Sequence, residues 1–225
     1  MTGLVNFVPW IAVEGTNATG KTYLVRQAID ALGPRCLPLT ELPDTPAALL
    51  PGRIIEALHT SGDPFLRTGV PRTETLLLAA LQVHRHETAL PRPGQIVLED
   101  RGPHSVAVYQ AVILCGGDAN DDELLCTART ILELIMRWRP LPPRVLLLVD
   151  DPGTCLARFE QRAGRAARAD EELLMRRVGC LYELLADLDP ARFQVLDRRL
   201  LTEQQCVAAI LDACHAAVLG GQQKG

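Results

Sequence analysis

Residues 15–22 read Gly-Thr-Asn-Ala-Thr-Gly-Lys-Thr and lie between a short apolar run and a helical pattern. The run is Trp10–Val13, and the residues from Lys21 to Leu32 carry apolar side chains at helical spacing. Glycines in such a loop let backbone N–H groups turn inward around a phosphate, and the following helix N-terminus adds its dipole. We therefore predict a phosphate-binding loop formed by Gly15, Thr16, Asn17, Ala18, Thr19, Gly20, Lys21 and Thr22.

Two side chains of this loop carry distinct chemistry. Lys21 is expected to reach the β- and γ-phosphates of a nucleoside triphosphate, and the Thr22 hydroxyl is expected to ligate Mg²⁺. Lysine occurs only at Lys21 and Lys224, whereas arginine is abundant elsewhere. A lysine kept in an arginine-rich chain favours a site that needs a compact ammonium group.

Strand and helix patterns alternate along the whole chain. The strands are continuous apolar runs, which is typical of a parallel sheet covered on both faces. The pattern predicts strands at 10–13, 36–39, 95–98, 144–149 and 193–196, and helices at 21–32, 46–59, 73–90, 104–114, 122–138, 153–161, 170–188 and 202–218. We predict an α/β fold with three α/β/α layers, a five-stranded parallel sheet, one domain over 1–225 and a flexible tail at 220–225.

Composition narrows the functional class. The 225 residues carry a net charge of −4, which argues against a nucleic-acid-binding surface. Seven cysteines without a C-x-x-C pair favour a reducing compartment. We find no signal peptide and no apolar run long enough to span a membrane, so we expect a cytoplasmic protein that binds neither nucleic acid nor membrane.

A second motif, Glu99-Asp100-Arg101, ends the predicted strand at 95–98. The carboxyl ends of parallel strands face the crevice in which ligands bind. Asp100 could complete the Mg²⁺ site with Thr22, and Arg101 could clamp a phosphoryl group. Glu99 is an alternative carboxylate for the metal.

A third motif is a run of arginines on a Gly/Ala-rich segment, with Arg162, Arg165 and Arg168. Phosphoryl transfer needs charge neutralisation and exclusion of water, which a mobile basic segment can supply. We predict a lid at about 162–170, called the lid segment below. A solvated junction between two helices is the plainer interpretation.

These motifs, in this order, resemble the thymidylate kinase family of P-loop nucleoside monophosphate kinases. Residues 13–22 look like the family's E-G-x-D-G-x-G-K-[ST] loop, and Asp100, Arg101, Ser105, Tyr109 and Gln110 look like its D-R-[YH]-x-x-S-x-x-A-Y-Q signature. Residues 76–80 are similar to the L-L-F-x-A segment over the acceptor base, and 150–158 to the segment whose arginine stacks on the donor adenine.

The resemblance implies ATP as the donor, Mg²⁺ as the cofactor, a nucleotide acceptor and a homodimer. It implies that Lys21 and the lid arginines serve the transferring group, that Arg158 stacks on adenine and that Arg101 grips the acceptor phosphate. Tyr109 and Ser105 would lie at the acceptor. The predicted helix at 104–114 is apolar nearly all round, which fits a core on one side and a second protomer on the other.

All departures from the family pattern fall on the acceptor side. Asn17 replaces the family's aspartate, and Gly102 replaces an aromatic residue. Leu78 replaces the aromatic that stacks on thymine, and Gln82 replaces the arginine that reads the base. The usual Glu-Pro-Gly-Gly-Thr appears as residues 41–45, Glu-Leu-Pro-Asp-Thr. We therefore expect a pyrimidine nucleotide acceptor that is dTMP-like but not plain thymidylate.

Two alternatives stay open. A nucleoside or another small-molecule hydroxyl could be the acceptor, with Glu14 as general base, because a hydroxyl must lose its proton during transfer. A nucleotide-binding regulatory protein on a decayed kinase scaffold would also explain the acceptor-side losses.

Overall fold

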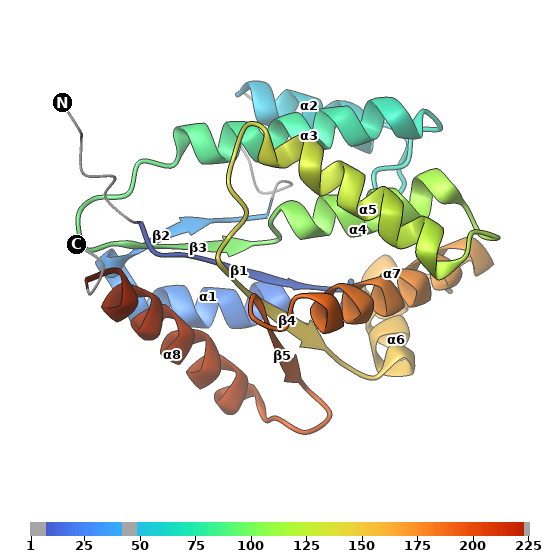
Figure 1. The fold of residues 1–225 in the computed structure, drawn as a ribbon. Helices are drawn as coiled ribbons and strands as arrows, with labels where there is room; N and C mark the ends of the chain where they lie inside the picture. The colour runs from blue at the N-terminus through green and yellow to red at the C-terminus, as the bar shows by residue number, and fades with distance from the viewer. Residues whose placement is uncertain (1–7, 42–48, 223–225) are drawn as a thin grey trace.

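The computed structural model describes residues 8–41 and 49–222 and has three layers (Figure 1). Five strands form one parallel sheet in the order β2-β3-β1-β4-β5. They are β1 (Trp10–Gly15), β2 (Cys36–Leu39), β3 (Ile96–Asp100), β4 (Arg144–Val149) and β5 (Phe193–Asp197). The predicted fold class and sheet are confirmed.

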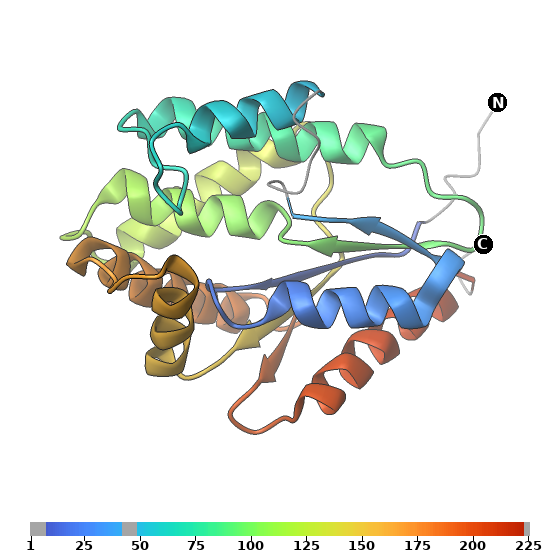
Figure 2. The ribbon, with the colours of Figure 1, turned by 180° about the vertical axis from the view of Figure 1, so that it is seen from behind.

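Helices α1 (Lys21–Leu32) and α8 (Glu203–Gln222) cover one face of the sheet (Figure 2). Their apolar side chains, among them Leu24, Val25 and Ile210, pack on Ile11 and Leu146 of the central strands. These strands are buried on both faces, which explains why their sequences are continuous rather than alternating apolar runs.

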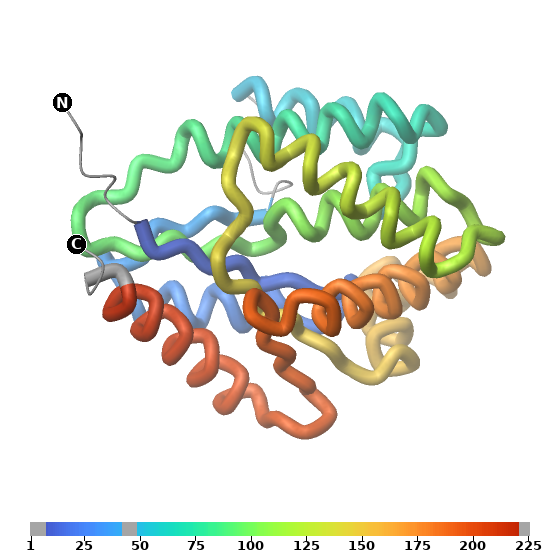
Figure 3. Tube along the Cα trace, viewed as in Figure 1, coloured from blue at the N-terminus to red at the C-terminus, as the bar shows by residue number. Residues whose placement is uncertain are grey.

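The other face carries α4 (Pro103–Cys115) and α7 (Ala169–Leu188), with α3 (Pro71–Thr88) and α5 (Asp121–Met136) packed outside them. Helices α2 (Leu50–His59) and α6 (Pro152–Ala163) and the short 3₁₀ turn η1 (Gly33–Arg35) complete the described elements. The carboxyl ends of the strands, the α6–α7 connection and the segment before α3 all lie at one end of the molecule (Figure 3).

Several predicted boundaries differ from the structure. Helix α8 continues to Gln222, beyond the predicted end at residue 218 and into the expected tail. The predicted helix at 46–59 begins at Leu50, and residues 46–48 lie outside the described part of the chain, as do Lys224 and residues 42–45 of the Glu-Leu-Pro-Asp-Thr stretch. In the described residues, no helix combines the length and hydrophobicity that a membrane span requires.

Helix α4 is enclosed by its own chain. It packs on α3, α5, α7 and β1, and nine of its residues are buried. The apolar residues around α4 are therefore explained within one protomer, because they pack against other helices and strands of the same chain. The homodimer stays a prediction, but this helix no longer supports it.

Candidate functional site

The P-loop is the short connection between β1 and α1. Gly15 has φ 140° and Gly20 has φ 86°, and a Cβ atom at either would collide with a neighbour, the Leu148 carbonyl group or the Arg198 guanidinium. Gly15 is thus required by the close approach of the Leu148 backbone, and Gly20 is favoured by its left-handed φ, since the Arg198 side chain could move. Ala18 has φ 63°, an uncommon value for a residue with a side chain.

Lys21 begins α1 with its ammonium group folded over the loop. Nζ donates to the Thr16 carbonyl oxygen and, at 3.2 Å, to Thr19 Oγ1. The side chain is buried, and burial, followed by the charge of Arg101, lowers the pKa of Lys21 to about 7. A bound polyphosphate would favour the charged ammonium, because opposite charge at close range offsets desolvation.

Asp100 lies at the tip of β3, beside the start of α1. Burial, followed by Glu41, raises the pKa of Asp100, and the nearby Thr22 hydroxyl partly offsets this rise. Within the described residues, Asp100 Oδ1 is buried without a hydrogen-bond partner. A hydroxyl beside an unpartnered carboxylate oxygen fits Mg²⁺, which prefers oxygen ligands and one or two carboxylates. The described part of the chain holds no cluster of three or more His, Cys, Asp or Glu side chains suited to a metal.

Arg101 connects the P-loop to the acceptor side. Its backbone has φ 59°, and its guanidinium donates to Glu41 Oε1, to Asn17 Oδ1 and, at 3.4 Å, to the Gly15 carbonyl oxygen. The guanidinium also lies 5.4 Å from the centre of the Tyr109 ring. Neighbouring anionic groups, Glu41 among them, raise the pKa of Arg101 despite its burial.

A cavity of about 140 Å³ extends from Arg101 between α3, α4 and the segment before α3. It brings together every predicted acceptor residue: Asn17, Leu78, Gln82, Arg101, Ser105 and Tyr109. It also includes Glu41, Phe65, Leu66 and Gln110 in its wall. Of these, Phe65 and Leu66 had no sequence signal, because they follow a loop whose path depends on distant contacts. We call this cavity the acceptor pocket.

At the far end of the acceptor pocket, a buried ion pair orients Gln82. Arg139 Nη1 and Nη2 each lie 3.1 Å from a Glu99 carboxylate oxygen, and Nη1 donates to Gln82 Oε1, also at 3.1 Å. A guanidinium only donates hydrogen bonds, so the amide oxygen of Gln82 faces Arg139 and its NH₂ group points elsewhere. Glu99 also accepts from Trp10 Nε1 and pairs with Arg85, which leaves it unsuited to the metal role considered above.

Glu14 is fully buried beneath the acceptor pocket. Its carboxylate accepts from Gly102 N at 2.8 Å, from Tyr182 Oη at 3.0 Å and from Ser105 Oγ. Burial raises the pKa of Glu14 more than these bonds lower it. It lines neither the acceptor pocket nor the cavity beside the P-loop described below, so a substrate hydroxyl would have to displace one of its partners to reach it.

The three lid arginines have different surroundings. Arg165 forms two hydrogen bonds of 2.8 and 2.7 Å with the buried carboxylate of Glu171, whose pKa falls to about 2. Arg168 pairs with Asp63 at 2.9 Å and with Glu171 at 3.2 Å. Arg162 forms no hydrogen bond or ion pair within the described part of the chain, and its charge helps to lower the pKa of Glu41.

On the donor side, Asp150 lies between two arginines. Arg158 pairs with it at 2.7 Å and donates to the Ala18 carbonyl oxygen at 3.4 Å, while Arg198 donates to the Thr19 carbonyl oxygen at 2.6 Å. Arg158 thus lies beside the P-loop, and its role in stacking on the donor adenine stays a prediction. Arg198 was missed, because no motif marks the residue that follows β5.

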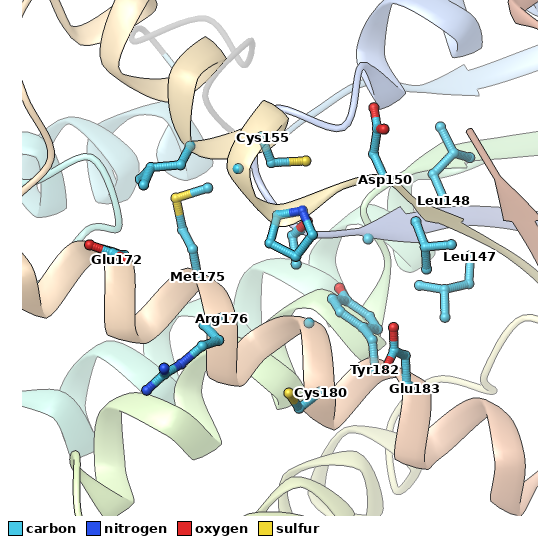
Figure 4. Close-up of a pocket in the computed structure, with 17 residues that line it drawn as sticks. Leu147, Leu148, Asp150, Cys155, Glu172, Met175, Arg176, Cys180, Tyr182 and Glu183 are labelled. Atoms are coloured by element: carbon cyan, nitrogen blue, oxygen red, sulfur yellow. The ribbon is translucent and has the colours of Figure 1, made fainter. Parts of the chain in front are cut away.

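A separate cavity of about 260 Å³ lies between β4, α6 and α7 (Figure 4). It touches Gly15 and Thr16, but its wall is mostly apolar and includes neither Lys21, Thr22 nor Arg101. His104 also lies away from the crevice. It is buried against Phe193, with ring centres 5.1 Å apart, and burial lowers its pKa to about 3.

Comparison with known proteins agrees with this geometry. No protein-family model matches the chain. It is 27% identical over 198 residues to a protein from Methanospirillum hungatei JF-1 that is named probable thymidylate kinase. The aligned residues make up 86% of this chain and 87% of that protein. The structure of a thymidylate kinase from Candida albicans matches its fold with a TM-score of 0.63, at 19% identity over 93% of this chain and 92% of that chain. The chain is therefore similar in sequence to a probable thymidylate kinase and shares its fold with a solved thymidylate kinase.

Proposed function

We propose that this protein is a nucleoside monophosphate kinase that transfers the γ-phosphoryl group of ATP to a pyrimidine nucleotide. The observation that carries the proposal is the position of Arg101. Its guanidinium contacts Asn17 and the Gly15 carbonyl group of the P-loop, and it also lines the acceptor pocket. An acceptor phosphate bound to Arg101 would therefore lie next to the donor phosphates.

In the transfer step, an oxygen of the acceptor phosphate forms a bond to the γ-phosphorus. The bond from that phosphorus to the β–γ bridging oxygen breaks, and ADP leaves. Lys21 would hold the donor phosphates, and Arg101 would hold the acceptor phosphate. Arg162 would neutralise negative charge on the transferring phosphoryl group. Thr22 and Asp100 would hold Mg²⁺, which neutralises phosphate charge and orients the donor. Catalysis here is positioning and charge neutralisation, without a covalent enzyme intermediate.

The acceptor base is selected by the amide of Gln82. Arg139 holds the amide oxygen, so the NH₂ group is the part of Gln82 that can serve a ligand in the acceptor pocket. A donor at this place favours a ring carbonyl oxygen over an exocyclic amino group. We infer a uracil- or thymine-type ring, altered from thymidylate because Asn17, Leu78 and Gln82 replace the residues that the family uses for dTMP.

Steady-state turnover of a panel of nucleoside monophosphates with ATP and Mg²⁺ tests this assignment. Keto pyrimidine nucleotides should exceed cytidine nucleotides in kcat/KM by about ten-fold or more, since one unpaired buried polar group costs about 1–3 kcal/mol. A preference for cytidine nucleotides would contradict the role of Gln82. Turnover of dTMP at ordinary kinase efficiency would contradict the altered acceptor preference.

One observation favours a second candidate, a kinase for a nucleoside hydroxyl. Glu41 lines the acceptor pocket and pairs with Arg101, so a carboxylate lies where a hydroxyl would need a base. Glu41, rather than the enclosed Glu14, is the residue to test. If thymidine is phosphorylated and Glu41→Gln abolishes that turnover, the hydroxyl kinase is correct. If nucleotides are the acceptors, Glu41→Gln should leave kcat within about ten-fold, because a phosphate needs no base.

A further inference from the structure

A cluster of ion pairs joins the lid segment to the residues just before α3. Arg168 Nη2 lies 2.9 Å from Asp63 Oδ2, and Arg67 bridges back, 2.8 Å from both Asp63 Oδ2 and Asp170 Oδ2. Asp63 is only 9% exposed, so these charges pair in a partly desolvated place. The cluster therefore fixes the residues around Asp63 relative to the start of α7.

The same carboxylate fixes the backbone of Phe65. Asp63 Oδ1 accepts from Phe65 N at 2.8 Å, and the Arg67 guanidinium lies 5.5 Å from the centre of the Phe65 ring. The next residue, Leu66, has φ 62°. A left-handed leucine persists only where surrounding contacts over-determine the backbone, and this cluster supplies such contacts.

Phe65 forms part of the wall of the acceptor pocket. Its ring is stacked near Tyr109, with centres 6.2 Å apart, and near Phe159 of α6, with centres 5.6 Å apart. Leu78, at the place of the family's stacking aromatic, lies in the same pocket and offers no ring. Phe65 is only 6% exposed, so it can offer an acceptor base the part of its ring that lines the pocket but no open face.

We propose that the Asp63–Arg168 ion pair positions Phe65 as the aromatic wall for the acceptor base. Arg168 is then a positioning residue for the acceptor, and the lid segment helps to build the acceptor pocket. Arg162, which has no such pairing in the described residues, is left to serve the phosphoryl group. This inference rests on the proposed function, because it assumes an acceptor with an aromatic base.

Equilibrium binding to two probes tests the role of Phe65. The probes are dTMP and 2-deoxyribose 5-phosphate, which keeps the sugar and phosphate but lacks the base. Phe65→Leu should weaken dTMP binding about ten-fold, since stacking on an aromatic ring is worth about 1–3 kcal/mol per base. Binding of the base-free probe should stay within about two-fold. Equal losses for both probes, or none for either, would overturn the role of Phe65.

We call the Asp63–Arg168 ion pair that holds Phe65 the clamp, and hydrogen exchange tests it without any substrate. In Arg168→Gln, the amides of residues 65–67 should exchange about ten-fold faster, because the contact that holds this segment is lost. The acceptor affinity should fall while ATP affinity is unchanged. Arg192→Gln is the matched control: Arg192 pairs with Asp189 at 2.9 Å, at the opposite end of β5 from the crevice. Arg192→Gln should change neither the amide exchange of residues 65–67 nor the binding of acceptor or ATP.

The two tests separate the inference from the proposed function. Unchanged amide exchange at residues 65–67 in Arg168→Gln would overturn the clamp, whatever the protein phosphorylates. Failure of the wild type to bind any pyrimidine nucleotide would overturn the proposed function and the role of Phe65 with it, while faster exchange would still support the clamp.

Discussion

The donor and acceptor halves of the crevice are built in different ways. The donor half is mostly eight consecutive residues, and its geometry follows from a short loop between β1 and α1. The acceptor half gathers side chains from α3, α4, the segment before α3 and Glu41, which follows β2, and it depends on contacts such as that between Arg139 and Gln82. A loop that binds through its own backbone keeps its ligand when residues elsewhere are substituted. A pocket built from side chains that are distant in the sequence can change its ligand when a few of them are replaced.

The largest effect is expected at the donor half. Lys21→Met removes the ammonium that we propose holds the donor phosphates, and kcat should fall by about 10²–10³-fold with weaker ATP binding. Lys224→Met, at the chain's other lysine, is the matched control and should retain wild-type turnover. Unchanged ATP affinity and turnover in Lys21→Met would mean that the P-loop does not act on phosphate here.

A pair of arginine substitutions separates the two halves. Arg101→Gln should reduce kcat/KM for the acceptor about 100-fold and leave ATP binding within about two-fold, because the substrate group that we propose Arg101 binds is the acceptor phosphate. Arg158→Gln should instead weaken ATP binding by about ten-fold and spare the acceptor. The halves would not be separable if both variants changed both substrates equally.

His104 lies on a helix of the acceptor half but should affect stability only. Its folded pKa of about 3 is below the ordinary value of 6.5 for an unfolded chain, so the folded state binds fewer protons between these values. The contribution of His104 to the free energy of unfolding is therefore fully present above pH 6.5 and is lost as the pH falls towards 3. Between pH 7 and 5, the wild type should lose about 2 kcal/mol more unfolding free energy than His104→Leu. Urea unfolding at both pH values measures this, and equal losses would contradict it.

The smallest effect is expected at Ala18. Its φ of 63° is strained for a side-chain-bearing residue, so Ala18→Gly should raise the unfolding free energy by up to about 1 kcal/mol. ATP affinity should be unchanged, since the loop already has its binding conformation. A destabilised Ala18→Gly protein would show that the left-handed conformation costs little in this loop.

The same difference between the two halves explains which features of the fold and the site could be predicted from the sequence. The strands at 36–39 and 144–149 and the helix at 21–32 match the structure, because continuous apolar runs and helical spacing are local signals. The family resemblance and the placement of Arg101 beside the P-loop follow from motifs of adjacent residues. Boundaries were less accurate: Pro71 starts α3 two residues early, since proline is well suited to the first turn of a helix.

The acceptor half held what sequence reasoning missed. Phe65 and Arg139 carry no motif, and their roles depend on partners 40 or more residues away, such as Tyr109 and Glu99. Glu14 illustrates the same limit, because its position before the loop indicated a base, whereas the fold encloses its carboxylate among three donors. Long-range side-chain contacts of this kind cannot be read from spacing.

Identification of the reaction products tests the central claim most directly. The protein is incubated with ATP, Mg²⁺ and a keto pyrimidine nucleoside monophosphate, and the products are resolved by mass spectrometry. The account predicts ADP and the nucleoside diphosphate in equal amounts. Tight ATP binding with no phosphorylated acceptor, or phosphorylation of the free nucleoside alone, would contradict it.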